Sequence, residues 1–413
     1  MTVVTEKEPS PEPSEPADDR PQRARRGLVA GPAVLTALSI LLALAVGAVL
    51  IIVSNPEVQE KASYFFTRPQ DTLGAAWTAV SEAYVALFQA SVINVEGSSL
   101  GQVFRPLTET LVTATPLIAA GLSVALAFRA GLFNIGAEGQ IIAASIAAAY
   151  VGFTWDLPIV IHLVVAIAAG MAAGAVWGGI AGLLKARTGA HEVITTIMLN
   201  YVARFLVVYL LGLKAFQREG RTDPISPVVA PAAELPLLLG AGFRLHLGFV
   251  LALLAAAFVW WLLARSTIGF RFRAVGANPN AARTAGISVE RSYTGVMLVA
   301  GALAGLAGVS QVLGTSGYLT AGVSGGIGFD AITVALLGRG SPVGTVLAGL
   351  LFGGLRAGGI GMQASTGTSV DLVLILQALI VLFIAAPPLV RAVFRIRTKG
   401  NVGVGQVSKG WNA

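Results

Sequence analysis

Long apolar runs separated by short polar segments make up most of the chain. They lie at 27–56 and near 108–128, 140–155, 158–184, 193–213, 247–264, 292–313, 326–338, 342–360 and 371–390. A membrane-crossing helix needs about 20 apolar residues, whereas a β-barrel strand shows about ten residues of alternating polarity. Most of these runs are long and do not alternate, and only the run near 326–338 is short enough for a half-helix. The pattern predicts an all-α polytopic membrane protein with about ten transmembrane or half-membrane helices.

The polar segments divide the chain into parts. The first part is rich in Pro, Glu and Asp and then in Arg, which predicts disorder. The run that follows it holds no charge and is longer than the apolar region of about 7–15 residues in a signal peptide. The parts are a disordered cytosolic tail (1–26), a first transmembrane helix (27–56), an extracytoplasmic segment with an amphipathic helix near 71–92 (57–106), a transmembrane core (107–390) with a cytosolic loop (265–291), and a cytosolic tail (391–413).

Basic residues predict the orientation of these helices. Ten crossings place both termini on one side, and cytosolic loops carry an excess of Lys and Arg. The basic clusters that fall on that side are Arg20, Arg23, Arg25 and Arg26; Lys185 and Arg187; Arg265, Arg271, Arg273, Arg283 and Arg291; and Arg391, Arg395, Arg397 and Lys399. Both termini are therefore predicted to be cytosolic. The basic loop 214–246 would face outward, which the charge rule tolerates in longer loops.

Composition excludes several classes of protein. Of the 413 residues, 55% are hydrophobic and 12% are charged, against about a quarter charged in soluble domains. The 49 glycines suit closely packed membrane helices. The net charge of +7 comes from basic residues beside apolar runs, so it indicates membrane orientation and not a nucleic-acid partner. The absence of cysteine excludes disulfides and thiolate metal sites.

Two common catalytic motifs are missing. A phosphate-binding loop ends in Gly-Lys-Ser/Thr, and the chain contains no Gly-Lys dipeptide. The three histidines, His162, His191 and His246, lie on separate segments without the spacing of a zinc hydrolase. We therefore expect no nucleotide hydrolysis through that motif, no metal site and no cofactor.

One polar stretch, Gly131–Gln140, interrupts the apolar pattern and carries Asn134, Glu138 and Gln140. Within a bilayer, a broken helix is tolerated only where it packs against protein or lines a wet cavity. An intramembrane carboxylate beside amides is therefore a candidate functional site. Its role can be catalytic or structural, and residue chemistry alone leaves both open for Glu138.

A second set of candidates lies on one face of a later run. Thr196 and Asn200 are one helical turn apart and can together line a path. The structural alternative is that Thr195 and Thr196 bond to the carbonyls of their own helix. Asp330 and Arg356 are expected to form a structural ion pair, because charges within a membrane need partners.

The stretch Arg271–Ile287 predicts a short helix in the longest cytosolic loop. Asn278 is a good N-cap, Pro279 suits the first helical position, and Gly286 is a natural stop. Such a small, self-capped helix can insert into a groove on a partner protein, or it can be an ordinary loop helix. These alternatives stay open on residue chemistry alone.

The chain resembles the permease subunits of ATP-binding-cassette (ABC) importers at Gly131–Gln140 and Arg273–Gly286, and further at Thr115–Leu122 and Glu192–Tyr201. The resemblance covers roughly 105–390 and is to the family that serves ribose-type sugars, nucleosides and branched-chain amino acids, in its nucleoside-uptake branch. His191 departs from the Asn that is more frequent there, so we assign that side chain no role. The long acidic tail is also given no role in transport.

The resemblance implies a multi-pass protein of the bacterial cell membrane, in contact with membrane lipid, that is not itself an enzyme. Its expected partners are a cytosolic ABC ATPase, a second permease subunit in a homo- or heterodimer, and an extracytoplasmic substrate-binding lipoprotein. The ATPase would receive a coupling helix in the cytosolic loop. The coupling residues are Arg273, Gly276, Asn278, Pro279, Ala281, Ala282 and Gly286.

The function so implied is uptake of purine or pyrimidine nucleosides by alternating access, with ribose-type sugars or another small polar solute as the alternative. Asn134, Glu138, Gln140, Thr196 and Asn200 are the candidates for the transport path. A membrane-embedded enzyme would need a nucleophile–base pair or a metal set, which these residues do not supply. An autonomous channel would not need the coupling-type loop.

Overall fold

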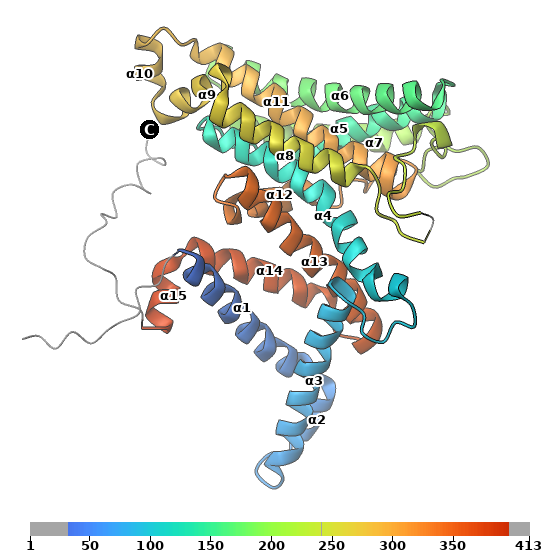
Figure 1. Ribbon diagram of the computed structural model, residues 1–413, viewed down its shortest axis with the longest axis vertical. Helices are drawn as coiled ribbons and strands as arrows, with labels where there is room; N and C mark the ends of the chain where they lie inside the picture. The colour runs from blue at the N-terminus through green and yellow to red at the C-terminus, as the bar shows by residue number, and fades with distance from the viewer. Residues whose placement is uncertain (1–31, 241, 396–413) are drawn as a thin grey trace, which may run out of the picture.

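The computed structural model describes residues 32–240 and 242–395, which are mainly α-helical and contain no named β-strand (Figure 1). The helices are α1 (Pro32–Ser54), α2 (Pro56–Ala62), α3 (Pro69–Ser91), α4 (Leu100–Arg129), α5 (Ala137–Thr154), α6 (Ile159–Thr188), α7 (Glu192–Leu211), η1 (Pro231–Ala233), α8 (Gly248–Arg265), α9 (Thr267–Ala277), α10 (Pro279–Thr284), α11 (Val289–Val309), the π-helix η2 (Ser310–Ser316), α12 (Ile327–Leu337), α13 (Pro342–Thr366), α14 (Val370–Ala385) and α15 (Pro387–Val393). The expected tail at 1–26 and most of the tail at 391–413 lie outside the described residues.

Every expected apolar run within the described residues is helical, although the run near 371–390 is divided between α14 and α15. Seven helices of this part of the chain are long and apolar enough to cross a membrane, or eight if α14 and α15, bent by 93°, form one span. The short run near 326–338 is α12, an apolar helix of 11 residues. The all-helical membrane fold is thus confirmed, while the count of ten elements and the cytosolic termini stay predictions.

The segment 57–106 contains the expected helix near 71–92, which is α3. It packs along α13 and also touches α1, where the Tyr84 hydroxyl donates to the Leu44 carbonyl at 2.6 Å. The next helix, α4, begins at Leu100, earlier than its apolar run suggests. Ser99 caps it by accepting from the Gln102 N–H, and the helix continues through Pro106.

Glycines allow the two most extensively packed helices, α6 and α11, to approach closely. On α6, glycines recur every four residues at Gly170, Gly174, Gly178 and Gly182. A Cβ added at Gly178 would lie 2.6 Å from the Met297 carbonyl oxygen of α11. This is the small-residue interface that membrane helices use, and it confirms the role expected for the glycines.

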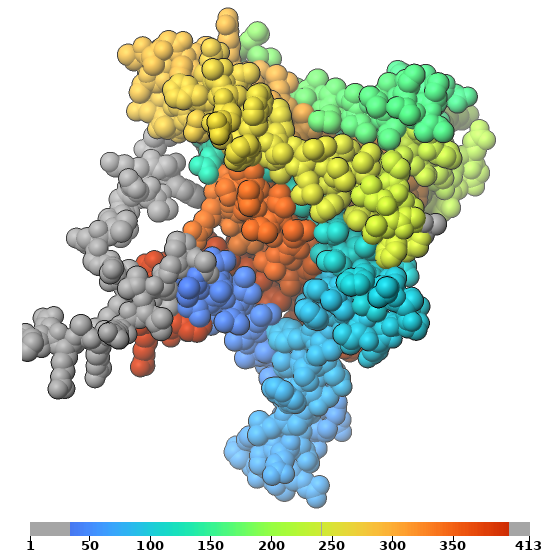
Figure 2. Space-filling model, in the orientation of Figure 1, coloured from blue at the N-terminus to red at the C-terminus, as the bar shows by residue number. Residues whose placement is uncertain are grey.

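The cytosolic loop proposed at 265–291 contains two helices, of which the expected one is α10. Sequence reasoning missed the longer α9, because its residues Arg271 and Arg273 suggested an exposed loop. Figure 1 shows α9, α10 and α15 at one end of the helical bundle and the connection between α7 and α8 at the other. In the space-filling view, α9 and α10 protrude at the upper left, and α2 with part of α3 protrudes at the bottom (Figure 2).

Candidate functional site

The polar stretch Gly131–Gln140 is the break between α4 and α5. Asn134 is fully buried there, and its Nδ2 donates to Ser123 Oγ and to Gln140 Oε1, both at 3.0 Å. Gln140 Nε2 donates in return to Asn134 Oδ1 at 3.0 Å, and the Gly136 N–H donates to the same oxygen at 3.1 Å. The two amides therefore satisfy one another and the broken backbone, as a bilayer interior requires.

Asn200 of α7 forms two hydrogen bonds to the backbone of this break. Its Nδ2 donates to the Ile135 carbonyl at 3.0 Å, and its Oδ1 accepts from the Gly139 N–H at 2.9 Å. One amide thus pairs with the backbone on both sides of Gly136. Thr196, one turn earlier, donates to the Glu192 carbonyl of its own helix at 2.7 Å, which is the structural alternative foreseen for it.

Glu138, in the first turn of α5, reaches across to α12. Its Oε2 accepts from the Gly328 N–H at 2.8 Å. Arg356 of α13 fixes the segment before that helix, because its Nη2 donates to the Gly325 carbonyl at 2.9 Å and its Nη1 donates to Asp330 Oδ2 at 3.3 Å. The expected pairing of Asp330 with Arg356 is confirmed.

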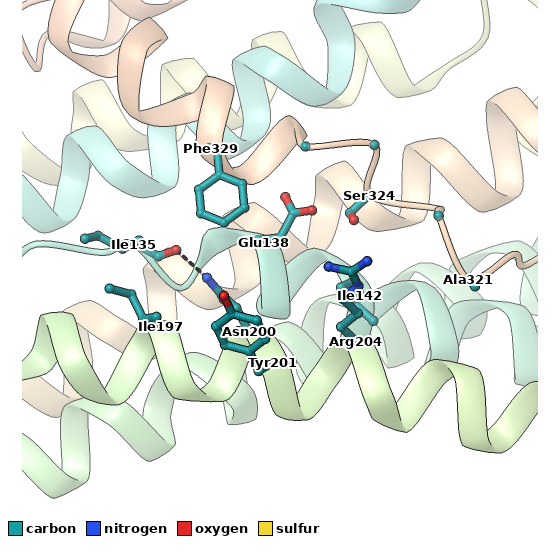
Figure 3. Close-up of a pocket in the computed structure, with 13 residues that line it drawn as sticks. Ile135, Glu138, Ile142, Ile197, Asn200, Tyr201, Arg204, Ala321, Ser324 and Phe329 are labelled. Atoms are coloured by element: carbon teal, nitrogen blue, oxygen red, sulfur yellow. Dashed lines mark hydrogen bonds between the residues drawn. The ribbon is translucent and has the colours of Figure 1, made fainter.

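A cavity of about 450 Å³ lies between these elements, lined by residues of α5, α7, the segment 321–326 and α12 (Figure 3). Glu138 and Asn200 line it. Asn134, Gln140 and Thr196, which were expected on a path, are buried behind its wall and bond within the protein. The structure therefore brings two of the five path candidates to the cavity and places three in its supporting layer.

Several cavity residues were not among the path candidates. Tyr201 and Phe329 are about half exposed and present aromatic rings from α7 and α12. Arg204, also on the wall, is exposed and makes no hydrogen bond or ion pair within the described part of the chain. Its spacing of four residues from Asn200 was the available signal, since i and i+4 share a helix face.

The short helix α10 has the expected caps. Asn278 Oδ1 accepts from the N–H groups of Asn280 and Ala281, both at 3.0 Å, and Pro279 is the first helical residue. Gly286 ends the turn with φ +79°. Ala282 is buried in a small cluster, whereas Ala281 and Arg273 are exposed.

Gly276, near the end of α9, lies against the break between α4 and α5. A Cβ added at Gly131, itself at φ +72°, would lie 3.2 Å from Gly276 Cα. A Cβ added at Gly276 would collide with the Arg129 carbonyl. The segment of α9 and α10 is therefore in backbone contact with the break between α4 and α5.

Comparison with known proteins identifies the family. Residues 107–385 match the model of the branched-chain amino acid transport system permease component. The chain belongs to this permease family. No solved structure matches it.

Curated relatives of this permease are also similar over most of their length. It is 43% identical to a guanosine ABC transporter permease of Bacillus subtilis over 71% of this chain and 84% of the relative. It is 39% identical to a glucose ABC transporter permease of Haloferax volcanii (67% and 75%) and 37% identical to a nucleoside ABC transporter permease of Lactococcus lactis (70% and 81%). The protein is thus a multi-pass permease component of an ABC transporter in the cell membrane and not an enzyme in its own right.

Proposed function

We propose that this permease imports nucleosides, purine or pyrimidine, through a path that includes the cavity beside Glu138. The observation that carries the proposal is this cavity, because it combines two aromatic rings with few polar groups in a protein related to guanosine and nucleoside permeases. A nucleoside offers a planar base for the rings and hydroxyls for polar partners. Ligand sites of this kind are mostly apolar with a few placed polar groups.

The energy for transport comes from a separate ATPase subunit that docks on α10. Three features support this docking site: α10 protrudes from the bundle (Figure 2), its ends are capped, and α9 joins it to the break at Gly131. Arg273 and Ala281 are exposed for contact, while Gly276, Asn278, Pro279, Ala282 and Gly286 shape the segment. ATP-driven closure of the partner moves α10 and switches the access of the path.

The topology of the proposal has ten membrane elements with cytosolic termini: α1, α4 to α8, and α11 to α14. The placement of α10 and α15 at one end of the bundle supports it (Figure 1). A second permease subunit completes the path, and exposed Arg204 supports this because a charge on a membrane helix needs a wet or protein environment. Substrate arrives from an extracytoplasmic binding lipoprotein.

A simple sugar is the second candidate substrate, favoured by the similarity to the glucose permease. The cavity distinguishes the two, because Phe329 and Tyr201 gain more from stacking on a flat base than on a sugar alone.

Uptake in cells tests the proposal. The chain is expressed with its ATPase, partner permease and lipoprotein in a strain that lacks nucleoside uptake, and entry of labelled guanosine is measured. We expect uptake that excess unlabelled nucleoside inhibits and excess glucose does not. Replacing 278–286 by a Gly-Ser linker is expected to abolish uptake and copurification of the ATPase. Uptake of glucose without uptake of nucleosides would support the sugar alternative.

A further inference from the structure

The Glu138 carboxylate is held in a fixed orientation with one oxygen unused. Its Oε2 accepts from the Gly328 N–H, whereas Oε1 has no hydrogen-bond partner among the described residues. In the close-up view the carboxylate points between Phe329 and Ser324, toward the cavity (Figure 3). A carboxylate oxygen can only accept hydrogen bonds, so this position calls for a donor on the ligand.

The nearest charged groups leave that oxygen available. Asp330 and Arg356 are paired with each other, and Arg356 also donates to the Gly325 carbonyl. Asn200 uses its amide on the backbone at Ile135 and Gly139. Arg204 is the remaining cation on the cavity wall and lies further along α7. The wall thus offers the unpaired Glu138 oxygen as an acceptor beside two aromatic rings.

The aromatic rings define the shape of the ligand that would supply this donor. Phe329 comes from α12 and Tyr201 from α7, so the two rings reach the cavity from different elements (Figure 3). Stacking on aromatic side chains tolerates any base, since every base has a π-face. The rings therefore favour a nucleobase but do not distinguish one base from another. Discrimination between bases then depends on hydrogen bonds to the polar edge of the base.

We propose that Glu138 accepts a hydrogen bond from the edge of the nucleobase and selects guanosine through its exocyclic amino group. This inference rests on the proposed function. Guanine presents two adjacent donors, the ring N1–H and the 2-amino group, to one carboxylate. Hypoxanthine, the base of inosine, has the same ring and N1–H but lacks the 2-amino group. A hydrogen bond to a charged group is typically strong enough for about tenfold or more in affinity.

Exchange of the carboxylate for an amide tests the proposal. In Glu138→Gln the amide oxygen can still accept from the Gly328 N–H, so the link to α12 is kept, while the NH₂ group faces the base as a donor. The ratio of guanosine to inosine uptake is measured in cells with the same lipoprotein for both proteins. We expect the ratio to fall about tenfold, toward equal uptake. An unchanged ratio in the variant would overturn the proposal.

Two further variants distinguish the proposed contact of Glu138 with the base from a general effect of losing a carboxylate and from stacking. Glu109→Gln changes a carboxylate of α4 that pairs with Arg244 at 3.2 Å, outside the cavity, and is expected to leave the ratio unchanged. Phe329→Leu is expected to weaken uptake of both nucleosides alike, because it removes stacking and leaves the edge contact. A selective loss of guanosine in Phe329→Leu would assign the discrimination to the ring instead of Glu138.

A binding measurement on the wild type keeps the proposal testable if Glu138→Gln does not fold. The complex of permease and ATPase is purified without the lipoprotein, and its thermal unfolding is followed with each nucleoside. Guanosine is expected to raise the midpoint more than inosine at equal concentration. Equal shifts would overturn the selection of guanosine by Glu138 and leave the proposed nucleoside transport intact. No uptake of any nucleoside by the wild type would overturn the proposed function itself.

Discussion

Gly276 of α9 packs directly on Gly131 in the break between α4 and α5, with 3.2 Å between Gly276 Cα and the position of a Cβ at Gly131. No side chain separates the two backbones. The break continues through Asn134, whose amide network supports it, to Glu138 on the cavity wall. A displacement of α9 and α10 therefore has a short, packed route to the proposed path.

A larger residue at Gly276 is expected to uncouple ATP hydrolysis from transport. In Gly276→Val the side chain would collide with the Arg129 carbonyl and push α9 away from the break, while the exposed surface of α10 stays intact. Changes along such a route alter coupling by about 0.5–2 kcal/mol, or roughly 2- to 30-fold. Uptake and ATP hydrolysis measured together in proteoliposomes should show a lower ratio of nucleoside to ATP.

Gly295→Ala is the matched control for this prediction. Gly295 lies on α11, and an added Cβ would meet only the Phe272 ring, at an ordinary 3.6 Å. Its coupling ratio should equal that of the wild type. A Gly276→Val transporter with an unchanged ratio would show that force does not pass through this contact.

The α6–α11 interface should be sensitive to a single methyl group. Gly174→Ala would press a Cβ against the backbone of Gly301 and Gly305, which cannot move aside without separating the helices. Overpacking of this kind typically costs about 1–3 kcal/mol. Thermal unfolding of the purified protein should show a lower midpoint, whereas Gly74→Ala on α3, where nothing lies within 4 Å of the added Cβ, should have no destabilising effect.

The periodic features of this fold could be predicted from sequence, because apolar run length and helix caps are local properties. The helix α10 with its cap Asn278 is an example. The start of α4 was harder to predict, because Pro106 and polar residues lie in the first turns of a helix that Ser99 caps. The missed helix α9 shows a related limit, because its basic residues suggested a loop, whereas Gly276 near its end lies against the backbone of Arg129 and Ala130, far away in the chain.

The candidate site was predictable only in part, for a related reason. Asn134 and Gln140 stood out as polar residues in an apolar context, yet their main partners are each other. Phe329 looked like an ordinary apolar residue, and only the folded arrangement places its ring on the cavity wall. Sequence can therefore identify an unusual polar group. Whether its side chain faces the cavity or bonds within the protein depends on contacts between segments far apart in the chain.

Asn200 should be essential for the geometry of the break. Asn200→Leu would leave the Ile135 carbonyl and the Gly139 N–H without their partner, and each buried unpaired group costs about 1–3 kcal/mol. Both the unfolding midpoint and nucleoside uptake should fall. Thr195→Val on the same helix removes only a bond to the His191 carbonyl and should change neither quantity substantially. Full uptake by Asn200→Leu would show that the bridge to α7 is dispensable.

The buried His246 should make stability depend on pH below about 6.5. The residue is 1% exposed, and its Nδ1 accepts from the Gly248 N–H at 3.1 Å, which requires that nitrogen to be unprotonated. Burial, with a smaller contribution from the Arg244 charge, lowers the pKa of His246 from 6.5 to about 4. Because the unfolded chain binds the proton first, this contribution is complete above pH 6.5 and is lost as the pH falls toward 4.

The expected loss for His246 is about 1.4 kcal/mol between pH 7.5 and pH 5.5, from one proton bound in the unfolded state alone. His246→Asn supplies an oxygen that can accept from the Gly248 N–H and does not titrate. Unfolding midpoints at the two pH values should therefore differ less in His246→Asn than in the wild type. His191→Asn applies the same exchange at an exposed position and controls for the substitution. If His246→Asn lost as much stability on acidification as the wild type, another group would be responsible, because the variant has no ring to protonate at this position.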